Sequence, residues 1–101
     1  MSTPRHTHPT DCLDRKAAAA EREQAQALRK QVREHESAME KLAADRSAID
    51  LAMFDPSKAT PTLAKLTMTE LMKRRAEVDA ALQEAEARWI EASEQLEQAA
   101  A

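Results

Sequence analysis

The residues best suited to metal chemistry lie at the N-terminus, where His6, His8 and Cys12 form the pattern H-x-H-x3-C. Imidazole and thiolate groups are the ligands that zinc prefers, usually in sets of four. No further histidine or cysteine stands nearby, and the surrounding segment has two prolines, three threonines and no apolar periodicity. We therefore predict a disordered tail over residues 1–12 and no metal site.

The other chemistry-bearing side chains do not form a catalytic set. Carboxylates are dispersed along the chain, and no serine, histidine and aspartate have a spacing that would bring them together. His35 has the spacing of a core residue, where its imidazole would be sensitive to pH. The chain also lacks glycine, which excludes the phosphate-binding loops of ATPases and dinucleotide-binding proteins. We predict no enzymatic activity and no cofactor.

Two groups of basic residues are the candidates for binding phosphates. The N-terminal basic group consists of Arg15, Lys16, Arg22, Arg29, Lys30 and Arg33. The tip basic group consists of Lys58, Lys65, Lys73, Arg74 and Arg75. We interpret the first as a solvated face and prefer the second for contact with nucleic acid. Because the net charge is -3 and no aromatic residues are interleaved, the expected binding is weak and strongly dependent on salt.

Composition places the chain among long helical proteins. It has 101 residues, of which 33% are charged, and its only aromatic residues are Phe54 and Trp89. Its abundance of Ala, Glu, Lys, Arg, Gln and Leu favours helix over strand. The single Cys12 excludes an internal disulfide, and no apolar run approaches the roughly 20 residues of a membrane span. The N-terminus also lacks the apolar core of a signal peptide. We predict an all-α, soluble, cytoplasmic protein without membrane contact.

Apolar residues recur with heptad spacing in two stretches, which is the pattern of coiled-coil helices. Both series step alternately by three and four residues. The first is Ala25, Leu28, Val32, His35, Met39, Leu42, Arg46, Ile49 and Met53. The second is Met68, Leu71, Arg75, Val78, Leu82, Ala85, Trp89, Ala92, Leu96 and Ala99. Two matching seams predict two partner helices.

Prolines and capping residues predict where these helices begin and end. Asp11 is a candidate N-cap for the first helix. Pro56 and Pro61 interrupt the helical pattern and predict a turn. The second helix is predicted to start at Pro61 or the next residue, with a kink at the capping box formed by Thr67 and Glu70. The predicted boundaries are 13–53 for helix one, 54–61 for the turn, 62–99 for helix two and 13–101 for the whole antiparallel coiled-coil hairpin.

Antiparallel pairing aligns the two seams in layers whose residue numbers add to a nearly constant value. This rule places Trp89 opposite Val32, where its ring fills the seam. It also places Arg46 opposite Arg75, and an aspartate four residues after each arginine lets both charged groups turn outward. We interpret this layer as a weak point or a contact site.

The same antiparallel pairing places the basic start of helix one beside the acidic end of helix two. A parallel dimer of long rods is the alternative, which the two prolines disfavour.

Two segments resemble a known family. The first helix ends in a turn similar to an Ala/Leu-x-Asp-Pro motif, and the second helix carries a Leu…Glu-x-x-Trp signature. The matching residues are Ala52-Met53-Phe54-Asp55-Pro56, Leu82, Glu86-Ala87-Arg88-Trp89 and Leu96-Glu97. On these motifs, the chain from about Arg15 to Gln98 resembles the C-terminal coiled-coil domain of ABC-F (Uup-like) ATP-binding proteins. The aromatic residue that often follows Asp-Pro in that family is absent here.

The resemblance implies a non-catalytic accessory domain that contacts DNA or ribosomal RNA. In that family the domain is attached to two ATP-hydrolysing cassettes. Walker A, signature and Walker B segments are absent from this sequence, so ATPase activity is not carried over. Separate ABC ATPase cassettes or a second copy of the chain are the protein partners to consider. The alternative function is a coiled-coil scaffold that binds a protein partner or itself.

Overall fold

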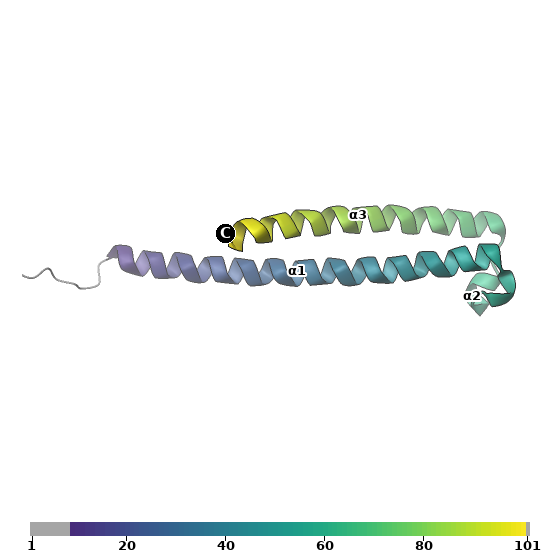
Figure 1. Cartoon of the computed structure of the whole chain (residues 1–101), viewed down its shortest axis with the longest axis horizontal. Coiled ribbons are helices and arrows are strands. Elements are labelled where there is room, and N and C mark those ends of the chain that lie inside the picture. Colours follow the sequence, from purple (N-terminus) through teal and green to yellow (C-terminus); the bar gives the residue numbers. More distant parts are fainter. Residues whose placement is uncertain (1–8, 101) are drawn as a thin grey trace, which may run out of the picture.

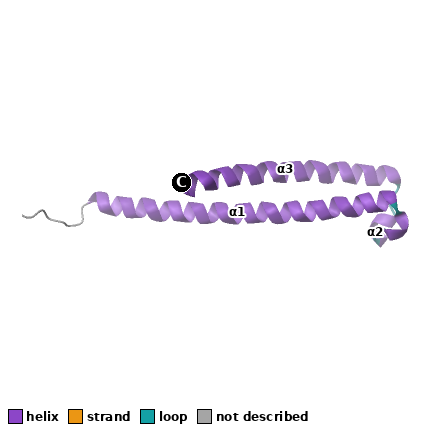
Figure 2. Ribbon diagram, viewed as in Figure 1, coloured by secondary structure: helices purple, strands orange, loops and turns teal. Residues whose placement is uncertain are grey.

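Two long antiparallel helices form the molecule, as the heptad pattern predicts. The structure is a computed structural model that describes the backbone of residues 9–100 and the side chains of residues 13–99. The long helices lie side by side, and a short helix folds back at the end where they are joined (Figure 1). All regular structure in the described part is helical (Figure 2), which confirms the predicted all-α hairpin. In chain order the elements are α1 (Pro9–Phe54), the 3-10 turn η1 (Pro56–Lys58), α2 (Pro61–Ala64) and α3 (Met68–Ala100).

Helix α1 runs for 46 residues because no glycine or proline interrupts it after its first residue. That first residue is Pro9, whose fixed φ angle and missing N–H suit the first turn of a helix. Helix α1 therefore begins about one turn before the predicted residue 13, and Asp11 lies inside α1 rather than at its N-cap. The rest of the predicted tail, residues 1–8, lies outside the described residues.

Capping side chains reverse the chain at the tip, which we define as Asp55–Thr67. No residue of the described chain has a positive φ angle, so the reversal uses short helical turns instead of a glycine turn. Asp55 Oδ1 accepts hydrogen bonds from the backbone N and the Oγ of Ser57 at 3.2 and 2.6 Å. Thr60 Oγ1 accepts one from Leu63 N at 3.4 Å. Each cap supplies an acceptor to a backbone N–H that has no partner within its own short helix.

Thr67 and Glu70 form the predicted capping box at the start of α3. Thr67 Oγ1 accepts a hydrogen bond from Glu70 N at 3.1 Å, and Thr67 N donates one to Glu70 Oε1 at 3.0 Å. This reciprocal pair starts a new helix, so the predicted single helix from Pro61 with a kink is wrong. Helix α2 ends at Ala64 and α3 begins at Met68, which makes the turn longer than predicted.

The predicted seam residues form the contact between α1 and α3. All of them are buried or half-buried except Met68, which is 50% exposed. Met68 is the first residue of α3, and Leu63 and Leu66 pack against the core cluster near it instead. The buried apolar residues are Ala25, Leu28, Ile49, Ala52, Leu71, Leu82, Ala85 and Ala92. Removal of this line of side chains from water holds the hairpin closed.

Ala52 is the most deeply buried of these residues at 2% exposed, although it lies outside the predicted seam. It belongs to a cluster with Ile49 and Leu71, against which Leu63 and Leu66 of the tip also pack. Helix α2 folds back beside α1 (Figure 1) and covers a side of α1 that α3 does not reach. The seam pattern missed Ala52 because its burial depends on the path of the tip.

We expect Leu71→Ala to destabilise the hairpin by about 2–5 kcal/mol, because it leaves a cavity in the cluster that joins α1, α3 and the tip. Leu71 is 4% exposed, whereas Leu51 is 42% exposed. Leu51→Ala is therefore the matched control and should cost much less. Urea unfolding followed by circular dichroism at one fixed protein concentration measures both. Equal losses would contradict the assigned core.

Candidate nucleic-acid interface

Four of the five residues in the tip basic group are open to solvent. These are Lys58, Lys65, Lys73 and Arg74. Lys58 makes a long contact with Asp55, with 3.9 Å between Nζ and Oδ2 and 70% of the lysine side chain exposed. Among the described side chains, Lys65, Lys73 and Arg74 take part in no ion pair. An exposed pair as long as that of Lys58 contributes little, so all four cations are available to a ligand.

Two carboxylates near these cations hold the backbone of the tip. Asp55 caps η1 through Ser57, and Glu70 belongs to the capping box with Thr67. Hydrogen bonds from the backbone N–H and side chain of Thr67 hold the pKa of Glu70 below its ordinary value. Hydrogen bonds thus hold both carboxylates in place, and basic residues still outnumber acidic ones from residue 51 to residue 75.

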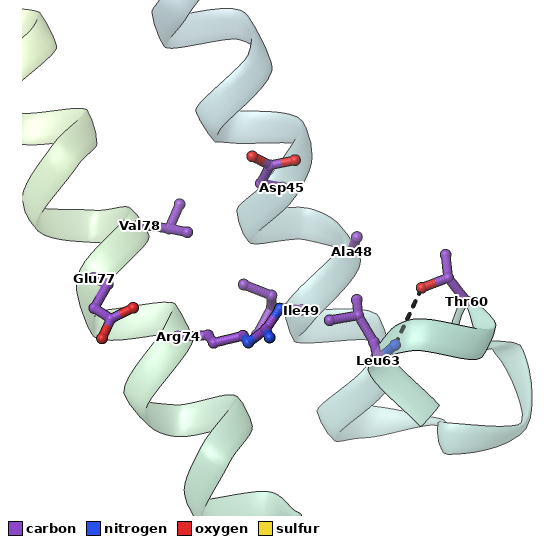
Figure 3. A pocket seen from close by; sticks show the side chains of 8 residues that line it. All are labelled: Asp45, Ala48, Ile49, Thr60, Leu63, Arg74, Glu77 and Val78. Carbon is purple, nitrogen blue, oxygen red and sulfur yellow. Dashed lines mark hydrogen bonds between the residues drawn. The ribbon is translucent and has the colours of Figure 1, made fainter. Parts of the chain in front are cut away.

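A groove of about 570 Å³ lies between the tip and the two long helices. Its floor is apolar and includes Ile49, Leu63 and Val78, while Arg74 and Glu77 from α3 stand at its edge. Figure 3 shows Arg74 reaching from α3 toward α1, with Leu63 on the opposite side of the groove. The position of Arg74 therefore depends on both long helices, whereas Lys58 and Lys65 extend from the short elements of the tip.

Arg75, the fifth predicted binding residue, is engaged within the hairpin. Its Nε donates a hydrogen bond to Asp50 Oδ1 on α1 at 2.5 Å, and its Nη1 donates one to Asp79 Oδ2 at 2.9 Å. Arg46 Nη1 donates to the other oxygen of Asp79 at 3.1 Å. The hydrogen bond from Arg75 is the main cause that lowers the pKa of Asp50, and the same bond raises the pKa of Arg75. Arg75 therefore has a structural role that its place in a basic run does not indicate.

These ion pairs also resolve the predicted layer of Arg46 and Arg75. We expected each arginine to turn toward the aspartate four residues later on its own helix. Arg75 does so with Asp79, but Arg46 pairs with Asp79 across the interface rather than with Asp50. Helical side chains lean toward the N-terminus of their own helix, so each arginine reaches one turn along the antiparallel partner. The layer joins the two helices through opposite charges and is not a like-charge contact.

Trp89 is half-buried at the seam, as predicted, and also makes a contact that the sequence analysis missed. Its Nε1 donates a hydrogen bond to Glu36 Oε1 at 3.1 Å. Glu36 lies one turn after Val32 on α1. The indole leans toward the N-terminus of α3, and this lean moves its contact along α1 by that one turn. The sequence offered one signal for this contact, because Glu36 is a carboxylate four residues after the predicted partner Val32. A half-buried tryptophan normally finds an acceptor for its N–H, and here the acceptor comes from the other helix.

The N-terminal basic group is spread along the exposed surface of α1. None of its members forms an ion pair among the described side chains, so the predicted compensation by the acidic end of α3 involves no direct contact there. The end of α3 lies near Glu21 and Gln24, and α1 continues beyond it (Figure 1). The group comprises Arg15, Lys16, Arg22, Arg29, Lys30 and Arg33, all of which are exposed.

Comparisons of the chain with models of known protein families, with curated proteins and with solved structures give no match. The resemblance to ABC-F coiled-coil domains therefore stays a prediction. Within residues 9–100, no helix has a stretch long and apolar enough to cross a membrane. The described residues also contain no group of three or more side chains placed to hold a metal ion; His6 and His8 lie outside them.

The pair of Asp50 and Arg75 makes the stability of the hairpin sensitive to acid. The pKa of Asp50 is lower in the folded chain than in the unfolded chain. Its contribution is therefore complete above the ordinary aspartate pKa and is lost as the pH falls through the lowered value. We expect Asp50→Asn to reduce the drop in melting temperature between neutral and acidic pH, measured by circular dichroism.

Asp45→Asn is the matched control, because Asp45 is exposed on the same helix and has no ion pair among the described side chains. It should retain the acid sensitivity of the unaltered chain. If Asp50→Asn retained it as well, the assignment of this pair would be wrong.

Proposed function

We propose that this chain is a non-catalytic accessory hairpin that contacts the phosphates of DNA or ribosomal RNA through its tip. The contacting side chains are Lys58, Lys65, Lys73 and Arg74. Arg75 is left out of this set because Asp50 and Asp79 already accept hydrogen bonds from it. Lysine and arginine bind phosphates without reading base sequence, so the interaction is positional rather than sequence-specific.

The observation that carries this proposal is that the acidic side chains of the tip are engaged as helix caps, whereas three of the cations are in no ion pair. The acidic side chains Asp55 and Glu70 are committed to capping short helical elements. The cations Lys65, Lys73 and Arg74 are exposed and take part in no ion pair among the described side chains. A cluster of exposed cations attracts polyanions and releases their counterions on binding. The resemblance to ABC-F coiled-coil domains supports the same class of partner.

A protein scaffold is the second candidate, and the thin core favours it. The hairpin has one seam with eight buried apolar residues, and no described side chain is less than 2% exposed. Half of these eight residues are alanine, whose burial contributes less than that of a larger side chain. Domains of about this size bury a small share of their surface and often gain stability from a partner.

We expect the tip to bind duplex DNA and structured ribosomal RNA at low salt and to release them as salt rises. For about three phosphate contacts on duplex DNA, affinity should fall about fortyfold when the salt concentration increases fourfold. Replacing Lys58, Lys65, Lys73 and Arg74 with alanine should remove most of the affinity and flatten the salt dependence. Fluorescence anisotropy titrations of labelled nucleic acid measure both quantities.

The matched control replaces the same number of cations on the exposed surface of α1, namely Arg22, Arg29, Lys30 and Arg33, with alanine. This variant should keep most of the affinity, because its changes lie away from the tip. Unchanged affinity in the tip variant would contradict the proposal. Equal losses in both variants would assign the binding to the overall charge of the chain and not to the tip.

A further inference from the structure

We propose that the outer face of α3 binds the same face of a second copy of this chain, with the two α3 helices antiparallel about a two-fold axis. The outer face consists of Met72, Ala76, Ala80, Gln83, Ala87 and Ile90. All six residues are exposed, and none belongs to the seam with α1. This interface shares only Lys73, at its edge, with the proposed phosphate-contacting side chains, and its formation does not require nucleic acid.

The spacing of these residues gathers them into one narrow stripe. Successive members are three or four residues apart, so their side chains lie above one another on the helix. The two ends carry large apolar side chains: Met72 is 57% exposed and Ile90 is 49% exposed. An apolar stripe on a helix normally packs against another element, whereas the described part of this chain supplies none here.

The stripe is complementary to a second copy of itself that runs in the opposite direction. When one α3 is laid antiparallel on another, Met72 of each copy lies opposite Ile90 of the other. The same alignment places Ala76 opposite Ala87, and Ala80 opposite Gln83 beside the axis. A two-fold interface requires this self-complementarity, because each surface patch meets its own copy. Alanine near the axis allows the two helices to approach closely, while the larger side chains pack at the ends.

Beside Met72 of each copy lies a hollow that can receive Ile90 of the other copy. It measures about 420 Å³ and lies beside Met72 and Ala76, with Met53 of α1 and the paired Arg75 and Asp79 also in its wall. The antiparallel alignment brings Ile90 of the second copy to this place. Met53 and Met72 have flexible thioether side chains that adapt to an inserted apolar group. Each end of the interface therefore has an apolar side chain and a hollow that can receive it.

Charge at the edge of the stripe favours the same arrangement. Lys73 and Glu91 follow the end residues Met72 and Ile90, so they lie on the same side of the stripe. Antiparallel pairing brings Lys73 of one copy toward Glu91 of the other, twice in the dimer. Neither residue takes part in an ion pair among the described side chains.

The hairpin exposes more surface than a compact monomer of its mass. A compact monomer of 11.2 kDa exposes about 5,700 Å² by the usual relation of area to mass. This chain exposes 7748 Å², which exceeds that value by about 2,000 Å². A standard interface removes about 800 Å² from each partner. Arg74 lines the groove on another side of α3, so the dimer leaves Arg74 free to bind phosphate while it engages Lys73.

Sedimentation equilibrium without nucleic acid tests this dimer. We expect a monomer–dimer equilibrium in the micromolar range, and Ala80→Glu should raise the dimer dissociation constant about tenfold or more, because it places two like charges beside the axis. Ala44→Glu is the matched control, since Ala44 is exposed on α1, and it should leave the constant unchanged. Helicity measured by circular dichroism verifies that both variants fold. A monomer at every concentration, or an equal effect of both changes, would overturn the proposal.

Disulfide trapping tests the direction of pairing. In a Cys12→Ser background, chains with Met72→Cys and chains with Ile90→Cys should cross-link when mixed and oxidised, and neither should cross-link alone. Cross-linking of the Met72→Cys chain with itself would indicate parallel pairing and overturn the antiparallel arrangement. A dimer in which the mixed pair also fails to cross-link would place the interface on another face and overturn the proposal.

Discussion

The apolar seam between α1 and α3 is the contact on which every other feature depends. Apart from the tip, which packs beside Ala52, the described chain offers neither long helix another apolar surface, so burial of the seam supplies most of the driving force for folding. The seam is thin because alanine fills several of its buried positions, including Ala25, Ala85 and Ala92. Small side chains let the helices approach closely but bury little area. The hairpin therefore exposes a large surface for its mass.

Polar contacts beside the seam add the specificity that an alanine-rich interface lacks. Asp50 meets Arg75, Arg46 meets Asp79, and Glu36 meets Trp89. Each step along α1 is matched by an equal step in the opposite direction along α3, so the three contacts agree on one register. Sliding one helix by a turn would break all three. Because the ion pairs are partly exposed, they select the register more than they add stability.

The absence of glycine has consequences for the surface of the hairpin. The chain reverses through capped helical turns, and those caps use Asp55, Thr60, Thr67 and Glu70. The longer tip brings α2 against α1 and buries Ala52, while its lysines remain in solvent. The basic tip and the outer stripe of α3 are separate surfaces of different chemistry. One hairpin can therefore present a phosphate-binding tip and a self-complementary helix face.

The two long helices, their antiparallel pairing and nearly all seam positions could be predicted from the sequence, because heptad spacing and proline are local signals that need no knowledge of the fold. The capping box at Thr67 was also readable, since its partners lie three residues apart. The role of Arg75, the contact of Trp89 with Glu36 and the burial of Ala52 could be found only in the folded hairpin. These depend on which side chains meet across the hairpin. The direction in which helical side chains lean displaces those meetings by one turn, so a basic run and a seam pattern do not reveal which cation is already paired.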